Sequence, residues 1–165
     1  MINIYFTFLL TFAISYISHS QITEPEDSWS GTYRMEFLDK PEQNTSPEQW
    51  YTIKKIANEN SEEIASRYTS DLERWAIIQV VDTTQHEKKL RRFLFSEDHN
   101  EYEQFNWTEQ HIKGTMKCVD GGNIFICKTT PKTTVSIDNE SFYSNSGIFA
   151  VVLHHGVFEF YKEPN

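Results

Sequence analysis

The stretch KGTMKCVDGGNIFICK, residues 113–128, predicts a β-hairpin and carries the only two cysteines of the chain. Two runs of strand-forming residues flank a Gly-rich reversal, and glycine at the first loop position suits a turn that needs positive φ. A two-residue loop at Gly122-Asn123 places Cys118 opposite Cys127 in a non-hydrogen-bonded pair. The Cα atoms of such a pair lie about 4.5 Å apart, which a disulfide tolerates. We therefore predict a Cys118–Cys127 disulfide; two free buried thiols are the alternative.

The first twenty residues, Met1–Ser20, are typical of a secretory signal peptide. An apolar run over 4–17 precedes small residues at the −3 and −1 positions, Ser18 and Ser20. An uncleaved membrane anchor is the alternative, but the run is short for a bilayer span. We expect a single domain over 21–165 in a secreted or periplasmic location, where disulfides persist.

The chain has 165 residues and a formal net charge of −9. A strongly acidic protein is repelled by nucleic acids and by anionic membranes, and its charge favours a soluble monomer. After residue 20 the longest apolar run covers only 148–153. We therefore expect no nucleic-acid partner, no membrane contact after signal cleavage and a monomer. N-glycosylation triplets begin at Asn44, Asn106 and Asn139, and they matter only in a source that glycosylates.

Short alternating runs with turn residues every eight to twelve positions predict about ten short strands and no long amphipathic helix. The first run, 29–38, places Tyr33, Met35 and Phe37 on one face. The other predicted strands cover 50–56, 63–69, 75–81, 89–96, 111–118, 124–129, 133–137, 141–143, 147–153 and 156–162. This spacing is typical of a β-sandwich or an up-and-down β-barrel.

The segment Trp29-Ser-Gly-Thr-Tyr33, followed by a strand, resembles the opening of calycin-type barrels. Lipocalins carry a Gly-x-Trp motif there, whereas here Trp29 precedes Gly31, so that motif is not matched. The region 133–162 resembles the closing strands of another calycin branch, the phycobiliprotein chromophore lyases. The resemblance implies a closed antiparallel barrel with an apolar ligand cavity, and no functional residue is carried over. We therefore predict an all-β, up-and-down antiparallel barrel of the calycin or lipocalin type with one hairpin disulfide.

Residue spacing gives no catalytic or metal motif. The histidines form no His-x-His or His-x-x-x-His pair, and adjacent His154 and His155 would point to opposite faces of a strand. Two cysteines alone are too few for a zinc site. No Gly-x-Ser-x-Gly motif is present. We expect no metal, no cofactor and no catalytic residue, although many hydrolase sites leave no local motif.

Aromatic residues cluster between positions 93 and 107, where they could line a pocket or fill a core. Arg91 and Arg92 are adjacent, so one of them points to the core side. Arg91 shares its face with Phe93 and Phe95, and we hypothesise that it lies at a cavity mouth and pairs with an acidic ligand head group. The candidate ligand-binding residues are Arg91, Phe93, Phe95, Tyr102 and Trp107.

The favoured function is non-covalent binding of a small, apolar or amphipathic ligand without catalysis. A surface or interaction module with a filled barrel is the alternative from another class, and an enzyme without a recognisable motif is the third. An empty interior of roughly 300–1,000 Å³ would favour the first, and a filled interior with an exposed apolar patch the second.

Overall fold

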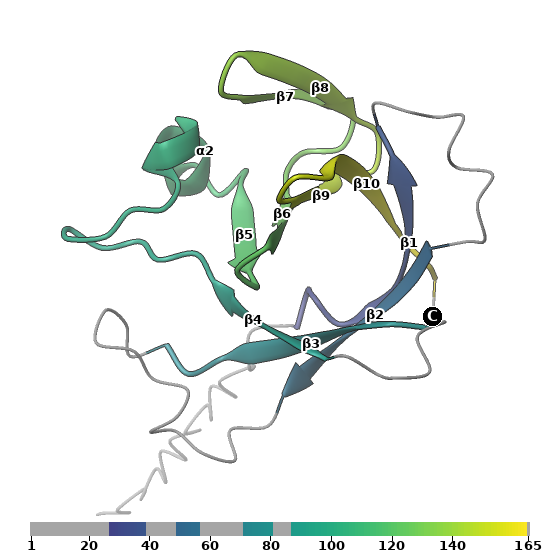
Figure 1. The fold of residues 1–165 in the computed structure, drawn as a ribbon. Helices are drawn as coiled ribbons and strands as arrows, with labels where there is room; N and C mark the ends of the chain where they lie inside the picture. Colours follow the sequence, from purple (N-terminus) through teal and green to yellow (C-terminus); the bar gives the residue numbers. More distant parts are fainter. Residues whose placement is uncertain (1–26, 39–48, 57–70, 81–86, 165) are drawn as a thin grey trace, which may run out of the picture.

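The computed structural model describes residues 27–38, 49–56, 71–80 and 87–164. Within these residues lie ten strands and two short helices (Figure 1). The strands are β1 (Gly31–Phe37), β2 (Gln49–Ile56), β3 (Arg74–Gln79), β4 (Lys88–Arg92), β5 (Lys117–Asp120), β6 (Ile124–Lys128), β7 (Thr133–Ile137), β8 (Glu140–Ser144), β9 (Ile148–Val152) and β10 (Gly156–Lys162). The helices are the 3-10 turn η2 (Glu103–Phe105) and α2 (Thr108–Ile112), and neither has the length or apolar character to span a bilayer.

Eight of these strands close into an antiparallel barrel. Each strand from β1 to β6 pairs with the next, β6 then pairs with β9, β9 with β10, and β10 with β1. The β7–β8 hairpin forms a separate two-stranded sheet between β6 and β9 in the chain. The prediction of an all-β, antiparallel up-and-down barrel is confirmed, and the architecture is compatible with calycin-type barrels. Closure leaves the eight described strands of the barrel without an edge strand.

The barrel encloses an interior core that is filled by its own side chains. The rings of Tyr33 and Phe160 lie 5.9 Å apart between centroids, Tyr51 lies 5.9 Å from Phe160, and the rings of Phe37 and Phe158 are 4.4 Å apart. The buried members are Trp29, Tyr33, Met35, Ile53, Trp75, Ile77, Leu90, Val119, Ile124, Ile126, Ala150, Phe158 and Phe160. Side chains that would surround a lipocalin-type cavity thus contact one another instead.

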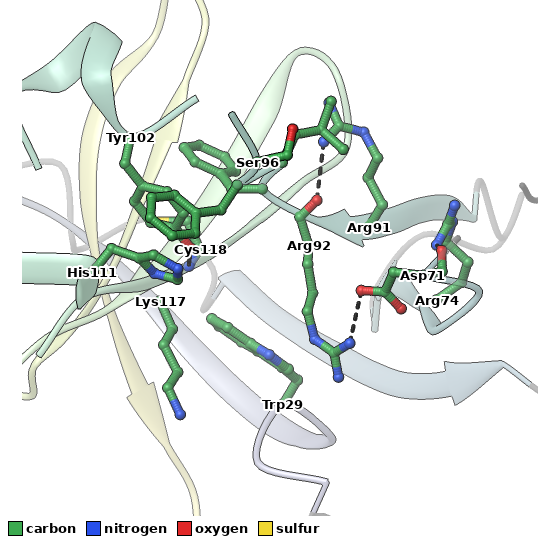
Figure 2. A pocket seen from close by; sticks show the side chains of 13 residues that line it. Trp29, Asp71, Arg74, Arg91, Arg92, Ser96, Tyr102, His111, Lys117 and Cys118 are labelled. Carbon is green, nitrogen blue, oxygen red and sulfur yellow. Dashed lines mark hydrogen bonds and ion pairs between the residues drawn. The ribbon is translucent and has the colours of Figure 1, made fainter. Parts of the chain in front are cut away.

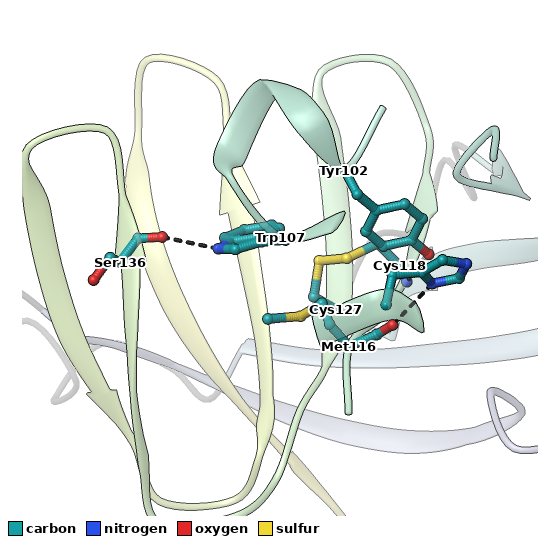
Figure 3. The surroundings of a disulfide bond; sticks show 7 residues. Tyr102, Trp107, Met116, Cys118, Cys127 and Ser136 are labelled. Carbon is teal, nitrogen blue, oxygen red and sulfur yellow. Dashed lines mark hydrogen bonds between the residues drawn. A yellow bond between two sulfur atoms is a disulfide. The ribbon is translucent and has the colours of Figure 1, made fainter. Parts of the chain in front are cut away.

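A second apolar layer, the outer core, lies on the outside of the barrel wall. It contains Phe93, Tyr102, Trp107, Met116, Cys118, Cys127, Val135 and Phe149. In Figure 1, α2 and the β7–β8 hairpin lie outside the part of the wall formed by β5, β6 and β9. Trp107 connects the two covering segments, because its Nε1 donates a hydrogen bond to the carbonyl of Ser136 in β7 at 2.9 Å (Figure 3).

A buried carboxylate holds the end of the β7–β8 hairpin against β10. Glu159 is 1% exposed, and its Oε1 accepts hydrogen bonds from the Ser144 hydroxyl at 2.9 Å and the Ser146 amide at 2.7 Å. A buried charged acceptor with several donors is a strong local anchor. The connection from β8 to β9 is therefore attached to the barrel by polar contacts as well as by ring packing.

The predicted hairpin is confirmed with its register. Cys118 faces Cys127, their Cα atoms are 4.1 Å apart, and the disulfide is formed. Gly122 has φ +86°, as the tight turn requires. Both cysteines point outward from the barrel and are buried within the outer core.

Two predicted strands are wrong in part. The strand expected over 111–118 begins only at Lys117, because α2 occupies Thr108–Ile112. The strand expected over 89–96 ends at Arg92, with Phe95 in an isolated bridge to Asn100. Tyr102 and Trp107 are each 2% exposed, and seating these rings on the barrel wall turns the chain away from an extended path. The segments 1–20 and 63–69 lie outside the described residues.

Candidate functional site

A groove of about 590 Å³ lies at the end of the barrel where β4 stops and β5 starts. Figure 2 shows Lys117 and Arg92 extending toward Trp29, with Tyr102 and His111 on the opposite side. The lining residues are Trp29, Asp71, Arg74, Arg91, Arg92, Phe93, Leu94, Phe95, Ser96, Tyr102, His111, Lys117 and Cys118. The groove therefore has an aromatic side and a cationic side.

The aromatic side is built from three rings held by backbone contacts. Tyr102 and His111 stack with centroids 3.9 Å apart, and Phe95 meets His111 edge-on at 4.5 Å. The Tyr102 hydroxyl accepts the Cys118 amide at 3.1 Å, and burial raises the pKa of Tyr102, so this hydroxyl stays protonated. Phe95 is 47% exposed, which leaves one large apolar ring open to a ligand.

The cationic side is built from Arg92 and Lys117. Arg92 is paired with two carboxylates, Asp71 at 2.7 Å and Glu73, and its guanidinium lies 5.4 Å from the ring centroid of Trp75. Lys117 is exposed and has no ion-pair partner within the described part of the chain. Among the described residues, Lys117 is therefore an unpaired lysine beside the aromatic rings.

Arg91 also lines the groove, but its guanidinium is already engaged. Its nitrogens donate to both oxygens of Glu101 at 2.7 Å each and to Asp120 at 3.0 Å. The hydrogen bonds that Arg91 donates to Glu101 raise the pKa of Arg91 above its ordinary value. The hypothesis that Arg91 pairs with an acidic ligand head group remains a prediction. In the structure, the acidic partners of Arg91 are Glu101 and Asp120 of the chain itself.

The structure brings four of the five predicted ligand-binding residues to this groove: Arg91, Phe93, Phe95 and Tyr102. Trp107 is not among its lining residues and instead lies in the outer core, under β7. Phe93 is 9% exposed and packs on Tyr102 with centroids 5.2 Å apart, so it contributes more to the core than to the groove surface.

Sequence reasoning missed the other groove residues, above all Trp29, His111 and Lys117. The sequence did contain a signal for Lys117. The predicted pairing of Cys118 with Cys127 also places Lys117 directly opposite Lys128, and two paired lysines are a candidate cationic site. Nothing local indicates that His111 stacks on Tyr102, since that contact depends on how the 93–116 segment folds over the barrel wall.

Chemically, the groove is suited to binding. In the described ranges, no three His, Cys, Asp or Glu side chains come together as a metal site. The Ser96 hydroxyl accepts the backbone amide of His99 at 3.2 Å, which is turn geometry and not nucleophile activation. Comparisons of the chain with protein-family models, with curated proteins and with solved structures find no match.

Proposed function

We propose that this protein binds a small, partly apolar ligand non-covalently in the groove at the barrel end and catalyses no reaction on it. One observation carries the proposal. The exposed ring of Phe95, which contacts Tyr102 and His111, lines the groove of about 590 Å³. Small-molecule sites are typically concave, largely apolar, and of this size.

The ligand site is placed outside the barrel because the interior core is filled. Kinship with calycins is part of the proposal, and the closed eight-stranded antiparallel wall supports it. An extracytoplasmic location is also proposed. It is supported by the Cys118–Cys127 disulfide, since such bonds persist in oxidising compartments.

Trp29 lines the groove, so a ligand bound there should change the tryptophan fluorescence of the protein. The secreted protein is first examined by native mass spectrometry for a co-purifying molecule and then titrated with a panel of amphipathic carboxylates, lipids and pigments. Phe95→Ser removes the exposed ring and is expected to weaken binding by about tenfold or more, because burying a phenylalanine contributes roughly 1.5–3 kcal/mol.

Tyr143→Ser is the matched control, because Tyr143 is 49% exposed but lies on β8, away from the groove. Equal loss in both variants, or a protein that is isolated free of ligand and binds nothing in the panel, would contradict the proposal.

An interaction module is the second candidate. The filled interior favours it, and so does Ile112, which is 68% exposed at the end of α2. Ile112→Lys would then abolish capture of a protein partner. Because Ile112 is not among the groove residues, the same variant would leave small-ligand binding unchanged.

A further inference from the structure

Three lysines occupy inward-facing positions at the same end of the barrel as the groove. Lys117 begins β5, Lys128 ends β6 and Lys162 ends β10. Side chains two positions apart in a strand share a face. The residues two positions away are Val119, Ile126 and Phe160, all 0% exposed in the interior core. The three lysines therefore stand on the rim of the interior core.

Pairing and close packing bring the three lysines together. Lys117 lies directly opposite Lys128, and directly opposite side chains have Cβ atoms about 4.5–5.5 Å apart. Lys162 crosses over Gly31, where an added Cβ would lie 2.6 Å from the lysine Cε. The Lys128 ammonium lies 4.7 Å from the ring centroid of Trp29, and the Lys162 ammonium 5.9 Å from that of Tyr33.

In the described part of the chain, no acidic side chain forms an ion pair with this cluster. Among the residues that the structure describes, no carboxylate oxygen lies within 4.0 Å of the three ammonium groups. Asp27 is close enough to act on Lys128, but its oxygens accept hydrogen bonds from the Trp75 indole at 2.9 Å and from Ser30. Farther round the rim, Asp71 and Glu73 pair with Arg92 and Lys55.

The arrangement is electrostatically unfavourable without an anion. Burial, followed by the charges of Lys162 and Lys117, lowers the pKa of Lys128 to about 8, against the opposing effect of Asp27. Like charges this close disfavour each other's ionised form. The Lys128 ammonium donates a hydrogen bond to the Ser28 carbonyl, which carries no net charge, so the positive charge of the cluster is not balanced there. A bound anion would remove the repulsion.

We propose that Lys117, Lys128 and Lys162 bind a tetrahedral oxyanion, the terminal group of a phosphate monoester or a sulfate ester. Ammonium groups are compact, strongly charged donors, and three of them match the charge and several oxygens of such a group. Because Lys117 also lines the groove, the inference specifies the ligand's anionic end, and in that respect it rests on the proposed function.

The test uses inorganic phosphate and sulfate as probes, with chloride at matched ionic strength, so that it does not depend on an apolar ligand. Binding is followed by the NMR resonances of the lysine Cε–Hε groups and by calorimetry. Phosphate and sulfate should bind, whereas chloride should not, and bound phosphate should raise the pKa of Lys128. Lys128→Met and Lys162→Met should each weaken phosphate binding by about tenfold or more.

Lys89→Met is the matched control, since Lys89 is an exposed lysine of β4 on the outward face opposite Ala76. Lys162 is exposed, so its variant keeps the test valid even if Lys128→Met does not fold. Equal, weak effects of all three salts would mean ionic screening only and would overturn the oxyanion site. If phosphate does not bind but an apolar ligand still requires Phe95, the oxyanion site fails and the proposed function stands.

Discussion

The interior core and the outer core are both apolar and buried, but they are assembled differently. The interior core draws side chains from all eight barrel strands, so every strand pairing protects it. The outer core depends on two segments that are not part of the barrel, the 93–116 connection and the β7–β8 hairpin, which cover one side of the wall. A disulfide and a tryptophan hydrogen bond accompany its packing.

This difference separates stability from binding. The interior core is surrounded by the eight barrel strands, and its buried side chains contact one another. The outer core has an edge, and the groove lies along that edge, where Phe95 and His111 remain accessible. Elements with fewer surrounding contacts open more easily than a closed core, and binding surfaces are drawn from them.

The largest expected effect is in the interior core. Phe160→Ala removes a ring that is 0% exposed and contacts Tyr33 and Tyr51, which should lower the free energy of unfolding by about 3–5 kcal/mol. Urea unfolding measures the change. Phe142→Ala, a partly buried ring of the outer core, is the comparison and should cost less. Equal losses would show that the two cores contribute alike.

The disulfide should rank second. Replacing both Cys118 and Cys127 by alanine removes a closure over nine positions, and we expect a loss of about 2–3 kcal/mol. The barrel should still form, because the β1–β10 and β6–β9 pairs are held by backbone hydrogen bonds that do not require the S–S bond. Urea unfolding measures the loss of stability, and the far-ultraviolet circular dichroism of the folded variant should be unchanged. A variant that loses its strand content would contradict the prediction.

Trp107→Phe should have a smaller and more local effect. The variant keeps most of the ring but loses the hydrogen bond from Nε1 to the Ser136 carbonyl, which costs about 1 kcal/mol. Hydrogen exchange should become faster at the amides of β7 and β8, while the β1 and β10 amides provide an internal reference. Faster exchange throughout the barrel would mean that the outer core is not a separate unit.

The smallest effect should come from charge at the rim. Lys128 has a folded-state pKa of about 8, below its ordinary value of 10.5, so the unfolded chain binds more protons between these two pH values. The contribution of Lys128 to stability therefore rises with pH through that window and is least favourable below pH 8. Lys162→Met removes one repulsive charge, while burial, Lys117 and Asp27 continue to act on Lys128.

The pKa of Lys128 should then move up toward its ordinary value. The free energy of unfolding of the variant, compared with the unmodified protein, should rise by a few tenths of a kcal/mol near pH 7 relative to pH 9.5. The effect is small because one exposed lysine contributes little. The lysine NMR resonances in a pH titration measure the pKa of Lys128. Urea unfolding at the two pH values measures the free energy of unfolding. An unmoved Lys128 titration would show that the lysines are too far apart to act on each other.

Much of the wall could be predicted because its patterns are local. Alternation over β1 identified the face of Tyr33 and Met35, and the loop at Gly122-Asn123 identified the pairing of Cys118 with Cys127. The candidate site was predicted less well. The aromatic cluster from 93 to 107 indicated groove residues, but the same pattern could not separate exposed Phe95 from buried Trp107.

By itself, then, the sequence determined most of the described strands, the hairpin and its bridge, since side-chain alternation and turn residues act over a few neighbouring positions. Only the tertiary structure decided that β10 closes on β1, that 93–116 folds back over the wall and that Lys117, Lys128 and Lys162 meet at one rim. These contacts join residues far apart in the chain, so they depend on barrel closure and burial and leave no local pattern.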